Sequence, residues 1–303
     1  PKLRADDLSP VSYPQDPSLE WCPPGHGDIY TALYGSGLLD KLIDAGFQYA
    51  ATANADNLGA APSAKVAGWF ASSGAPYAAE VCERTLADVK GGHLAVRNSD
   101  GRIILRDTAQ TPSDQMHYFT DQYRHPYFHT NNLWFDLVAL REVLRQRDGV
   151  LGLPLIRNAK TVNPADSTTT PVVQIECAMG AAIEAFEGAS AIEVPRSRFL
   201  PVKTTNDLMV LRSDAYEIDA AGQLHATVDQ VCVAELAPRY YKTIHQFEQR
   251  VSQGAPSLCQ AQRLVVHGDW TFGADVVVKG EVTLADAGVA SQVPDGTLLE
   301  QTN

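Results

Sequence analysis

The stretch WCPPGHGD, residues Trp21–Asp28, joins a polar, proline-rich start to the first helical pattern of the chain. Its prolines stiffen the backbone, and its glycines allow a sharp turn and the close approach of a ligand. Asp28 is placed to cap a helix, because apolar residues recur at helical spacing from Ile29 to Ile43, before Gly46. A glycine loop that enters a helix N-terminus suits anions. We therefore predict a ligand loop with a phosphate cradle; an ordinary loop-to-helix junction is the open alternative.

Composition describes a globular protein with an acidic surface. The 303 residues are 45% hydrophobic and 20% charged, which predicts a large core and about two domains. The net charge of −12 and the lack of a basic stripe argue against nucleic acid as a partner. An anionic small substrate would need local Lys or Arg side chains, or a metal ion, to offset this charge.

Cysteine usage and hydropathy indicate a cytoplasmic protein. The five cysteines are widely spaced and form no CxxC pair, which favours reduced thiols. No apolar run approaches the roughly 18 residues of a membrane span, and residues 1–20 do not resemble a signal peptide. The chain begins without methionine, and we expect it to be a fragment or a processed product.

Three predicted strands carry polar residues of interest. Residues 47–53 read as a buried strand that runs into Asn54 and Asp56, and ligands of open α/β sheets bind beyond such strand ends. Asp56 is an oxygen ligand of the kind that Mg²⁺ prefers, or else a turn aspartate that caps a helix near Leu58. A strand over 77–84 contains Glu80. An Asp-Gly turn predicts a hairpin of 94–97 with 102–106, just after Gly91 and Gly92.

The middle of the chain offers two further candidate regions. Residues 127–135 lead into a predicted helix that ends near Arg147, so Asn131 and Asn132 either cap that helix or bind sugar hydroxyls. A strand over 172–175 precedes a helix predicted for 176–187. Three cations at 196, 198 and 203 lie within a stretch that also holds apolar residues, and this mixture favours an anion clamp over a bland surface loop.

The last segment has a six-residue repeat. Two apolar rows keep this step, one formed by Leu264, Trp270, Val276 and Val282 and the other by Val266, Phe272, Val278 and Leu284. Such a repeat predicts a β-helix. About two coils fit, too few to be stable alone, so we expect the β-helix to dock on the main domain or on another subunit. Residues 220–262 connect the parts, with a helix near 244–251.

Six motifs together resemble one family of enzymes. They are WCPPGHGD (21–28), NADNLG (54–59), ADVKGGHL (87–94), TNNLW (130–134), NAKTV (158–162) and VPRSRFLPVKTTNDL (194–208). With these, the chain resembles the UTP–glucose-1-phosphate uridylyltransferases, or UDP-glucose pyrophosphorylases. The long motif at 194–208 separates them from the related UDP-N-acetylhexosamine pyrophosphorylases. The terminal repeat also looks like the C-terminal left-handed β-helix of that family.

The resemblance implies a reaction and its machinery. The family joins UTP and glucose 1-phosphate into UDP-glucose and pyrophosphate, reversibly and with Mg²⁺. By position, Gly25 would contact uracil through its backbone, and His26 would face the phosphates. Asn54 and Asp56 would meet ribose, phosphate and metal, with Asp56 as the metal ligand. Lys203 matches the lysine treated as catalytic.

The sugar end carries over less directly. Glu80, Gly92 and Asn131 fall where related sugar nucleotidyltransferases hold sugar hydroxyls. His93 and His129 stand where the resemblance implies threonine and asparagine, which leaves the choice of sugar open. A broader UDP-sugar pyrophosphorylase is therefore one alternative, and a non-catalytic UDP-sugar-binding or assembly protein is another.

The resemblance also implies a missing part and a domain plan. The family's glycine-rich nucleotide loop lies upstream of WCPPGHGD, so the phosphate cradle is expected there, and Pro23–Gly25 becomes a rigid wall against uracil. We expect this chain alone to be inactive. The predicted fold is α/β, with a Rossmann-like nucleotidyltransferase domain (1–225), a connecting segment (226–262) and a left-handed β-helix (263–303) through which a homo-oligomer could form.

Overall fold

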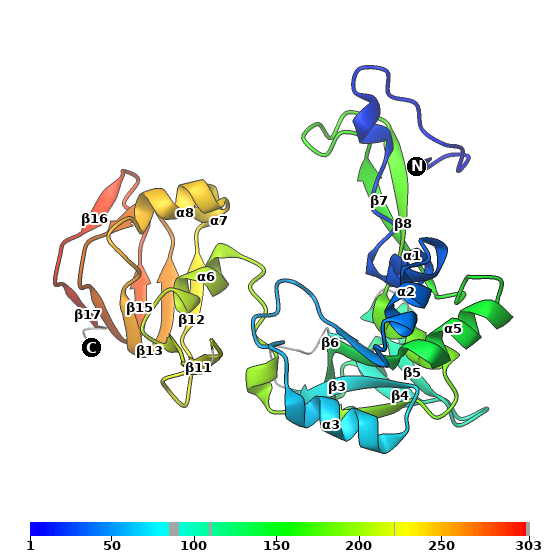
Figure 1. Cartoon of the computed structure of the whole chain (residues 1–303). Coiled ribbons are helices and arrows are strands. Elements are labelled where there is room, and N and C mark those ends of the chain that lie inside the picture. The colour runs from blue at the N-terminus through cyan, green and yellow to red at the C-terminus, as the bar shows by residue number, and fades with distance from the viewer. Residues whose placement is uncertain (85–90, 109–110, 221, 301–303) are drawn as a thin grey trace. The chain divides into compact units, whose positions relative to one another are not determined.

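The computed structural model describes residues 1–84, 91–108, 111–220 and 222–300. The chain folds into two compact units, each drawn in Figure 1. The first unit consists of Pro1–Asn54 and Pro62–Pro195, and the second of Ala55–Ala61 and Arg196–Asn303. Of the motif at 87–94, residues 87–90 lie outside the described part of the chain.

The first unit mixes strands with short helices. The strands are β1 (Leu3–Arg4), β2 (Tyr49–Thr52), β3 (Tyr77–Glu83), β4 (His93–Val96), β5 (Ile103–Arg106), β6 (Tyr127–Asp136), β7 (Leu155–Thr161), β8 (Pro171–Cys177) and β9 (Ser190–Glu193). The α-helices are α1 (Ile29–Gly35), α2 (Leu38–Asp44), α3 (Ala64–Ser73), α4 (Met116–Phe119) and α5 (Leu137–Gln146). The 3-10 segments include η1 (Pro17–Glu20), η2 (His26–Asp28), η5 (Ser113–Gln115) and η6 (Met179–Ala185).

A four-stranded mixed sheet is the framework of this unit. Its order is β2-β6-β3-β9, with β6 antiparallel to both neighbours and β9 parallel to β3. Helices α1, α2 and α5 and segment η6 supply apolar side chains to one core, which includes the fully buried Tyr30, Tyr77 and Phe135. The predicted strands at 47–53, 77–84 and 172–175 are confirmed, as is the hairpin, which forms from β4 and β5.

Three helix predictions in this unit are wrong in detail. The apolar pattern from 29 to 43 forms two helices rather than one, because Gly37 adopts a left-handed φ of 71° between α1 and α2. Asp28 makes no capping bond through its side chain, since it already lies within the 3-10 turn η2. The stretch 176–187 forms the end of β8 and the 3-10 segment η6, not an α-helix.

The two asparagines at 131 and 132 lie within strand β6 and do not cap a helix. Asp136 caps α5 instead, and its carboxylate accepts from the backbone N–H of Ala139 at 2.8 Å. The sequence pattern did not separate these roles because a strand runs directly into the helix with no loop between them.

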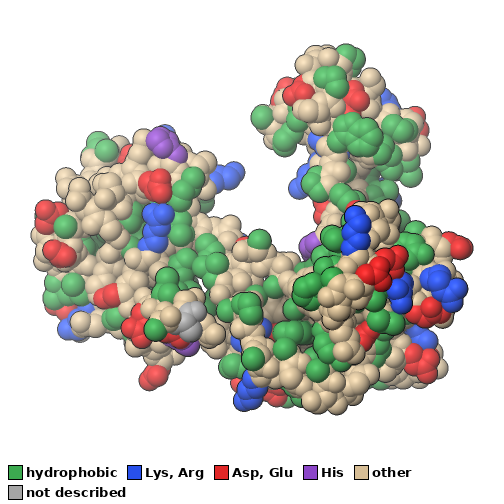
Figure 2. Space-filling model, in the orientation of Figure 1, with side chains coloured by type: hydrophobic (Ala, Val, Ile, Leu, Met, Phe, Trp, Pro, Cys, Tyr) green, Lys and Arg blue, Asp and Glu red, His purple; other side chains and the backbone are tan. Residues whose placement is uncertain are grey.

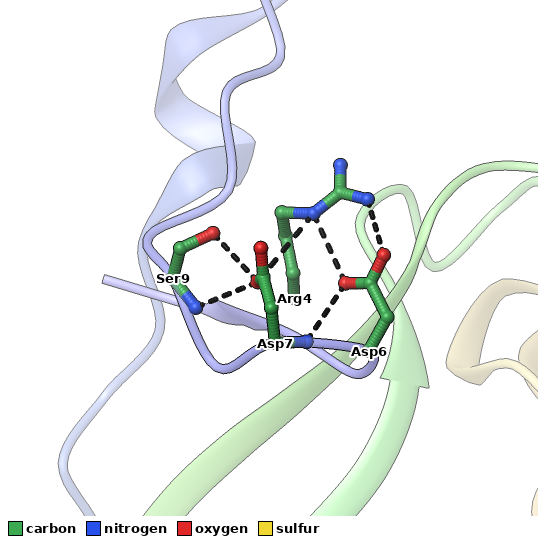
Figure 3. A network of polar contacts seen from close by, with 4 residues as sticks. All are labelled: Arg4, Asp6, Asp7 and Ser9. Atoms are coloured by element: carbon green, nitrogen blue, oxygen red, sulfur yellow. Dashed lines mark hydrogen bonds and ion pairs between the residues drawn. The ribbon is translucent and has the colours of Figure 1, made fainter.

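A hairpin of β7 and β8 extends from the sheet and carries the N-terminal segment, as Figure 1 shows. Strand β1 adds to it by pairing with β8. The turn after β1 is held by local polar contacts (Figure 3): Arg4 Nε donates to Asp6 at 3.0 Å, and Asp7 accepts from the backbone N–H and hydroxyl of Ser9 at 2.9 and 2.7 Å. These exposed contacts shape the turn and add little stability.

The second unit is built on parallel strands. Its strands are β10 (Tyr216–Ile218), β11 (Leu224–Ala226), β12 (Val233–Leu236), β13 (Ser257–Val266), β14 (Trp270–Phe272), β15 (Val277–Leu284), β16 (Ser291–Val293) and β17 (Leu298–Glu300). Its helices are α6 (Thr205–Leu211), α7 (Pro238–Tyr241) and α8 (Ile244–Arg250), with a 3-10 turn at Arg196–Arg198. One parallel sheet has the order β12-β13-β15-β17, and β14 pairs in parallel with β16.

Both rows of the predicted hexad repeat point into one core. Leu264, Phe272, Val276 and Val278 are almost fully buried there, with Trp270 and Leu284 packed against them. The helix predicted near 244–251 is confirmed as α8. The sequence therefore placed the apolar rows and the strand-rich character of this segment correctly.

The compact units divide the chain differently from the predicted domains 1–225, 226–262 and 263–303. The boundary between units falls at Pro195–Arg196. Helix α6 belongs with the parallel sheet because Asn206 Oδ1 accepts from the backbone N–H of Leu236 on β12 at 3.0 Å. The predicted domain boundaries remain predictions.

Charged side chains of both signs lie on the surface. Acidic and basic side chains are interspersed over the face drawn in Figure 2. Among the described residues, no helix is both long and apolar enough to cross a membrane.

The buried core of the parallel sheet in the second unit leads to a prediction about stability. Leu264→Ala should lower the free energy of unfolding by about 2–5 kcal/mol, because it opens a cavity in a fully buried position. Leu298→Ala, in the neighbouring part of the same sheet but exposed, should stay within about 0.5 kcal/mol of wild type. Urea unfolding followed by tryptophan fluorescence measures both, and equal losses would contradict the assignment of this core.

Candidate active site

A bulge in strand β6 is the central feature of the first unit. Ala79 on β3 pairs with Leu133, and Val81 pairs with His129, so residues 130–132 all lie opposite Glu80. Within this bulge Asn131 has a φ of 62°, in the left-handed region. A side chain there costs about 1 kcal/mol, and asparagine tolerates it better than most residues. The bulge therefore turns Asn131 out of the ladder of strand hydrogen bonds.

Glu80 fixes the bulge from below. Its side chain is 0% exposed, and its carboxylate accepts from Trp134 Nε1 at 2.9 Å and from Asn132 Nδ2 at 3.1 Å. Its backbone carbonyl accepts from the hydroxyl of Thr130 at 2.8 Å. A buried carboxylate is tolerated only when hydrogen-bonded in this way. The structure thus places Glu80, which the sequence predicted at the sugar, in the core beneath the bulge.

Three of the predicted residues come together above it. Asn131 Nδ2 donates to Asn54 Oδ1 at 2.9 Å, although the two lie far apart in sequence. The backbone N–H of Asn131 donates to His129 Nδ1 at 3.2 Å. The backbone N–H of His129 in turn donates to the carbonyl of Gly92 at 2.9 Å. Asn54, Gly92 and Asn131 therefore form one cluster, with His129 as the link.

His129 is a buried neutral imidazole. The side chain is 6% exposed, and burial, together with the nearby His26, lowers its pKa to about 4. Since Nδ1 accepts a hydrogen bond, the ring proton is on Nε2. This N–H has no acceptor among the described residues. An unpaired buried donor costs about 1–3 kcal/mol, which sets this residue apart.

His26 is fixed by the start of segment η6. Its Nδ1 accepts from the backbone N–H of Met179 at 2.9 Å, so a neutral ring carries its proton on Nε2. Partial burial lowers the pKa of His26, although the side chain keeps an exposed face. Gly25, with φ of 83°, leaves no room for a side chain, because a Cβ would lie 2.7 Å from the carbonyl oxygen of Cys177. The WCPPGHGD loop is thus clamped to the end of β8 with one imidazole N–H available.

In the second unit, Asn57 joins two segments. Its Oδ1 accepts from the backbone N–H groups of Gly59 and Leu200 at 3.1 and 2.8 Å, and its Nδ2 donates to the carbonyl of Arg198 at 3.1 Å. Gly59 packs so closely on Ser197 that a Cβ would overlap it. These contacts hold the NADNLG motif against the 194–208 motif.

This arrangement places Asp56 beside Lys203. The backbone N–H of Val202 donates to the carbonyl of Asp56 at 2.9 Å, and Lys203 Nζ lies 3.2 Å from Asp56 Oδ2. The backbone N–H groups of Lys203 and Thr204 donate to Asp207 at 2.9 and 2.8 Å, so the start of α6 sets the position of the lysine.

The ion pair itself is open to solvent. The side chains of Lys203 and Asp56 are 62% and 36% exposed. Such pairs contribute about 0–1 kcal/mol to stability. Either partner can therefore exchange the other for a substrate or a metal ion at little cost to the fold.

The other two cations of the predicted anion clamp have structural contacts. Arg198 donates to the carbonyl of Ala61 at 2.9 Å, and the guanidinium of Arg196 lies 5.2 Å from the ring centre of Phe199. Lys203 is the member of the three whose amine pairs with a predicted site residue.

Asp56 also fits the role predicted for a metal ligand. In the described part of the chain, no group of three or more His, Cys, Asp or Glu side chains could hold a metal alone. Mg²⁺ commonly binds one or two protein carboxylates, with waters and substrate phosphates completing the shell. A single part-exposed carboxylate suits that type of site.

Sequence reasoning missed several residues that shape the site. Asn57 and Asp207 lie inside quoted motifs, but nothing in the sequence distinguishes their support of the backbone from direct contact with a ligand. Met179 acts through its backbone, which leaves no signal in the side-chain pattern. His129 differs from the asparagine that the resemblance implies, but the sequence does not show that its imidazole is buried.

Comparisons with known proteins agree on one family. A family model described as UTP–glucose-1-phosphate uridylyltransferase matches residues 1–279. The enzyme of that name from Hordeum vulgare is 39% identical over 306 residues, covering 99% of this chain and 62% of that protein; the one from Saccharomyces cerevisiae is 35% identical, covering 99% and 60%. The crystal structure of a mutant UDP-glucose pyrophosphorylase from Leishmania major in complex with UDP-glucose matches with a TM-score of 0.89 and 44% identity, covering 100% and 66%. The chain spans about three fifths of the length of these curated relatives.

Burial of His129 makes the stability of the protein sensitive to acid. The unfolded chain binds a proton at this histidine near pH 6.5, whereas the folded chain resists until about pH 4. As pH falls through this window, wild type should lose up to about 1.4 kcal/mol per pH unit relative to His129→Asn. Urea unfolding of both proteins at pH 5, referenced to pH 8, measures the difference; a constant difference would contradict a buried neutral imidazole.

Proposed function

The chain belongs to the UTP–glucose-1-phosphate uridylyltransferase family, and from that premise we propose that the protein containing it forms UDP-glucose and pyrophosphate from UTP and glucose 1-phosphate. The observation that carries the proposal is the pairing of Asp56 with Lys203, which joins the NADNLG motif to the long, highly specific motif at 194–208. The crystallised relative with bound UDP-glucose supports the same class of ligand.

The reaction is a substitution at phosphorus. A phosphate oxygen of glucose 1-phosphate attacks the α-phosphorus of UTP. The bond between this phosphorus and the oxygen that bridges it to the β-phosphorus breaks, and pyrophosphate leaves with that electron pair. Two anions must meet, so catalysis consists largely of positioning and charge neutralisation. Lys203 supplies a fixed positive charge from an exposed position and is the proposed catalytic residue. The reaction requires no covalent nucleophile.

Asp56 is the proposed ligand of Mg²⁺. When bound, this ion would neutralise phosphate charge, an effect worth several kcal/mol in the transition state. Lys203 and the ion would share the same carboxylate, so an ion held by Asp56 would leave Lys203 free to contact the substrate phosphates.

The first unit supplies the proposed nucleoside and sugar contacts. Gly25 and the rigid prolines before it would face uracil, and His26 would donate from Nε2 to phosphate. Asn54 would meet ribose and phosphate. Gly92 and Asn131 would meet sugar hydroxyls, supported by the bond between Asn131 and Asn54. We propose that Glu80 contributes by holding the bulge, since its carboxylate is already bonded to Asn132 and Trp134.

The finer features of the fold follow the same premise. We propose a Rossmann-like nucleotidyltransferase domain, a left-handed β-helix over 263–303 and a cytoplasmic location. Leu264 lies beside Val282, three steps of the hexad repeat later, and Trp270 lies beside Ser291, which supports coiled parallel strands. The exposed end of such a coil is the proposed contact of a homo-oligomer.

The proposal is tested directly with the full protein that contains this chain. Pyrophosphate release is followed in a coupled assay with UTP and Mg²⁺, and glucose, galactose and N-acetylglucosamine 1-phosphates are compared. A strong preference for glucose 1-phosphate supports the proposal, and comparable rates would instead identify a broader UDP-sugar pyrophosphorylase. Binding of UDP-glucose without turnover would identify a non-catalytic protein.

Lys203→Ala should reduce turnover by about 10²–10³-fold, the usual cost of removing a charge-stabilising group from an active site. The melting temperature should change little, because the pair with Asp56 is exposed. Lys279→Ala, which removes another exposed ion-paired lysine, is the matched control and should retain wild-type turnover. Near-normal turnover of Lys203→Ala would overturn its assigned role.

A further inference from the structure

The left-handed residue in the β6 bulge needs support from its surroundings. Asn131 adopts φ of 62° within a strand, while its side chain reaches Asn54 at 2.9 Å. An asparagine backbone adopts other conformations more readily, so contacts must hold this one. The backbone N–H of Asn131 provides such a contact, because it donates to His129 Nδ1 at 3.2 Å.

The imidazole of His129 is held so that this bond persists. The ring is buried, and its Cε1 packs against Gly180 so closely that a Cβ at Gly180 would lie 2.7 Å away. The backbone of His129 is tied to the carbonyl of Gly92 at 2.9 Å. Ring and backbone are thus both held, and the Nδ1 lone pair faces the N–H of Asn131.

The two ring nitrogens of His129 differ in their hydrogen bonds. In the described part of the chain, Nε2 has no hydrogen-bond partner. Here the buried imidazole gains its one side-chain hydrogen bond within the described residues through Nδ1, and that bond goes to the residue proposed to read the sugar.

We propose that His129 is a positioning residue for the sugar: its unprotonated Nδ1 accepts the N–H of Asn131 and fixes the left-handed turn that aims the Asn131 amide. This inference rests on the proposed function, because it takes the sugar to lie at Asn131. His129 is not a catalytic residue, since it acts through its neighbour. The role requires an acceptor at the Nδ1 position and nothing from Nε2.

Two substitutions of similar size separate the two ring nitrogens. His129→Asn keeps an acceptor oxygen near the Nδ1 position, whereas His129→Gln places its terminal amide near the Nε2 position. In the full protein, His129→Gln should raise KM for glucose 1-phosphate about 10-fold or more, because misplacement of a binding group is costly. KM for UTP should stay within about 2-fold of wild type. In the separate variant His129→Asn, KM for glucose 1-phosphate should stay within about 3-fold of wild type. Thermal unfolding of both variants checks that they fold.

A second test introduces His129→Gln into a protein that already carries Asn131→Gly. Glycine takes left-handed φ without cost and has no amide to aim. If His129 acts through Asn131, His129→Gln should change the KM for glucose 1-phosphate by less than about 2-fold in this background. An equal effect in both backgrounds, or a His129→Asn variant as impaired as His129→Gln, overturns the proposal.

Opposite results have their own meaning. Full function in His129→Gln with loss in His129→Asn would show that Nε2 donates to a ligand or a buried water, and would also overturn the proposal. Failure of the proposed function is distinguishable, because wild type itself would then release no pyrophosphate. Should His129→Gln fail to fold, the comparison of His129→Asn with wild type still decides, since loss of sugar affinity there removes the case for Nδ1.

Discussion

The buried carboxylate of Glu80 is the constraint on which the first unit depends. It lies at 0% exposure, where an unpaired charge would be very costly, so the strand opposite must supply donors. Asn132 and Trp134 do so from β6, and Thr130 bonds the backbone of the same residue. To bring all of these onto one glutamate, β6 must bulge, and the bulge is what turns Asn131 toward Asn54. A core requirement thus sets the geometry of the surface above it.

The second unit separates backbone support from an exposed ion pair in a similar way. Asn57 is buried and bonds three backbone groups, while its neighbour Asp56 faces solvent and pairs with Lys203. Asn57 contributes to stability, whereas Asp56 can exchange its partner because its exposed ion pair adds little to the free energy of unfolding. Neighbouring positions of the NADNLG motif therefore do opposite work, and mutational effects on stability and on turnover should fall on different residues.

Sequence patterns predicted the strands well, since alternation, apolar rows and Asp-Gly turns are local signals. The motifs, in turn, indicated the family. The patterns failed where conformation depends on distant contacts. The apolar period from 29 to 43 could not reveal that Gly37 would break the helix. Of the two alternatives for Asn131 and Asn132, the helix cap is wrong, because β6 continues to the start of α5 and Asp136 caps that helix. Nor did the sequence show that Glu80 is buried and hydrogen-bonded, because its partners are 50 or more residues away in sequence.

Charge imposes the last constraint. In the proposed reaction, a chain of net charge −12 would have to neutralise anionic phosphates locally, since its overall field repels them. The 194–208 motif offers three cations, but Arg198 bonds the carbonyl of Ala61 and Arg196 stacks on Phe199. Lys203 is held ready by a single exposed carboxylate, an arrangement that neither buries its charge nor ties it to the core. In the proposed reaction, an arriving phosphate would compete for Lys203 and a metal ion would compete for Asp56. Breaking this one weak contact would present the positive charge of Lys203 to an anion.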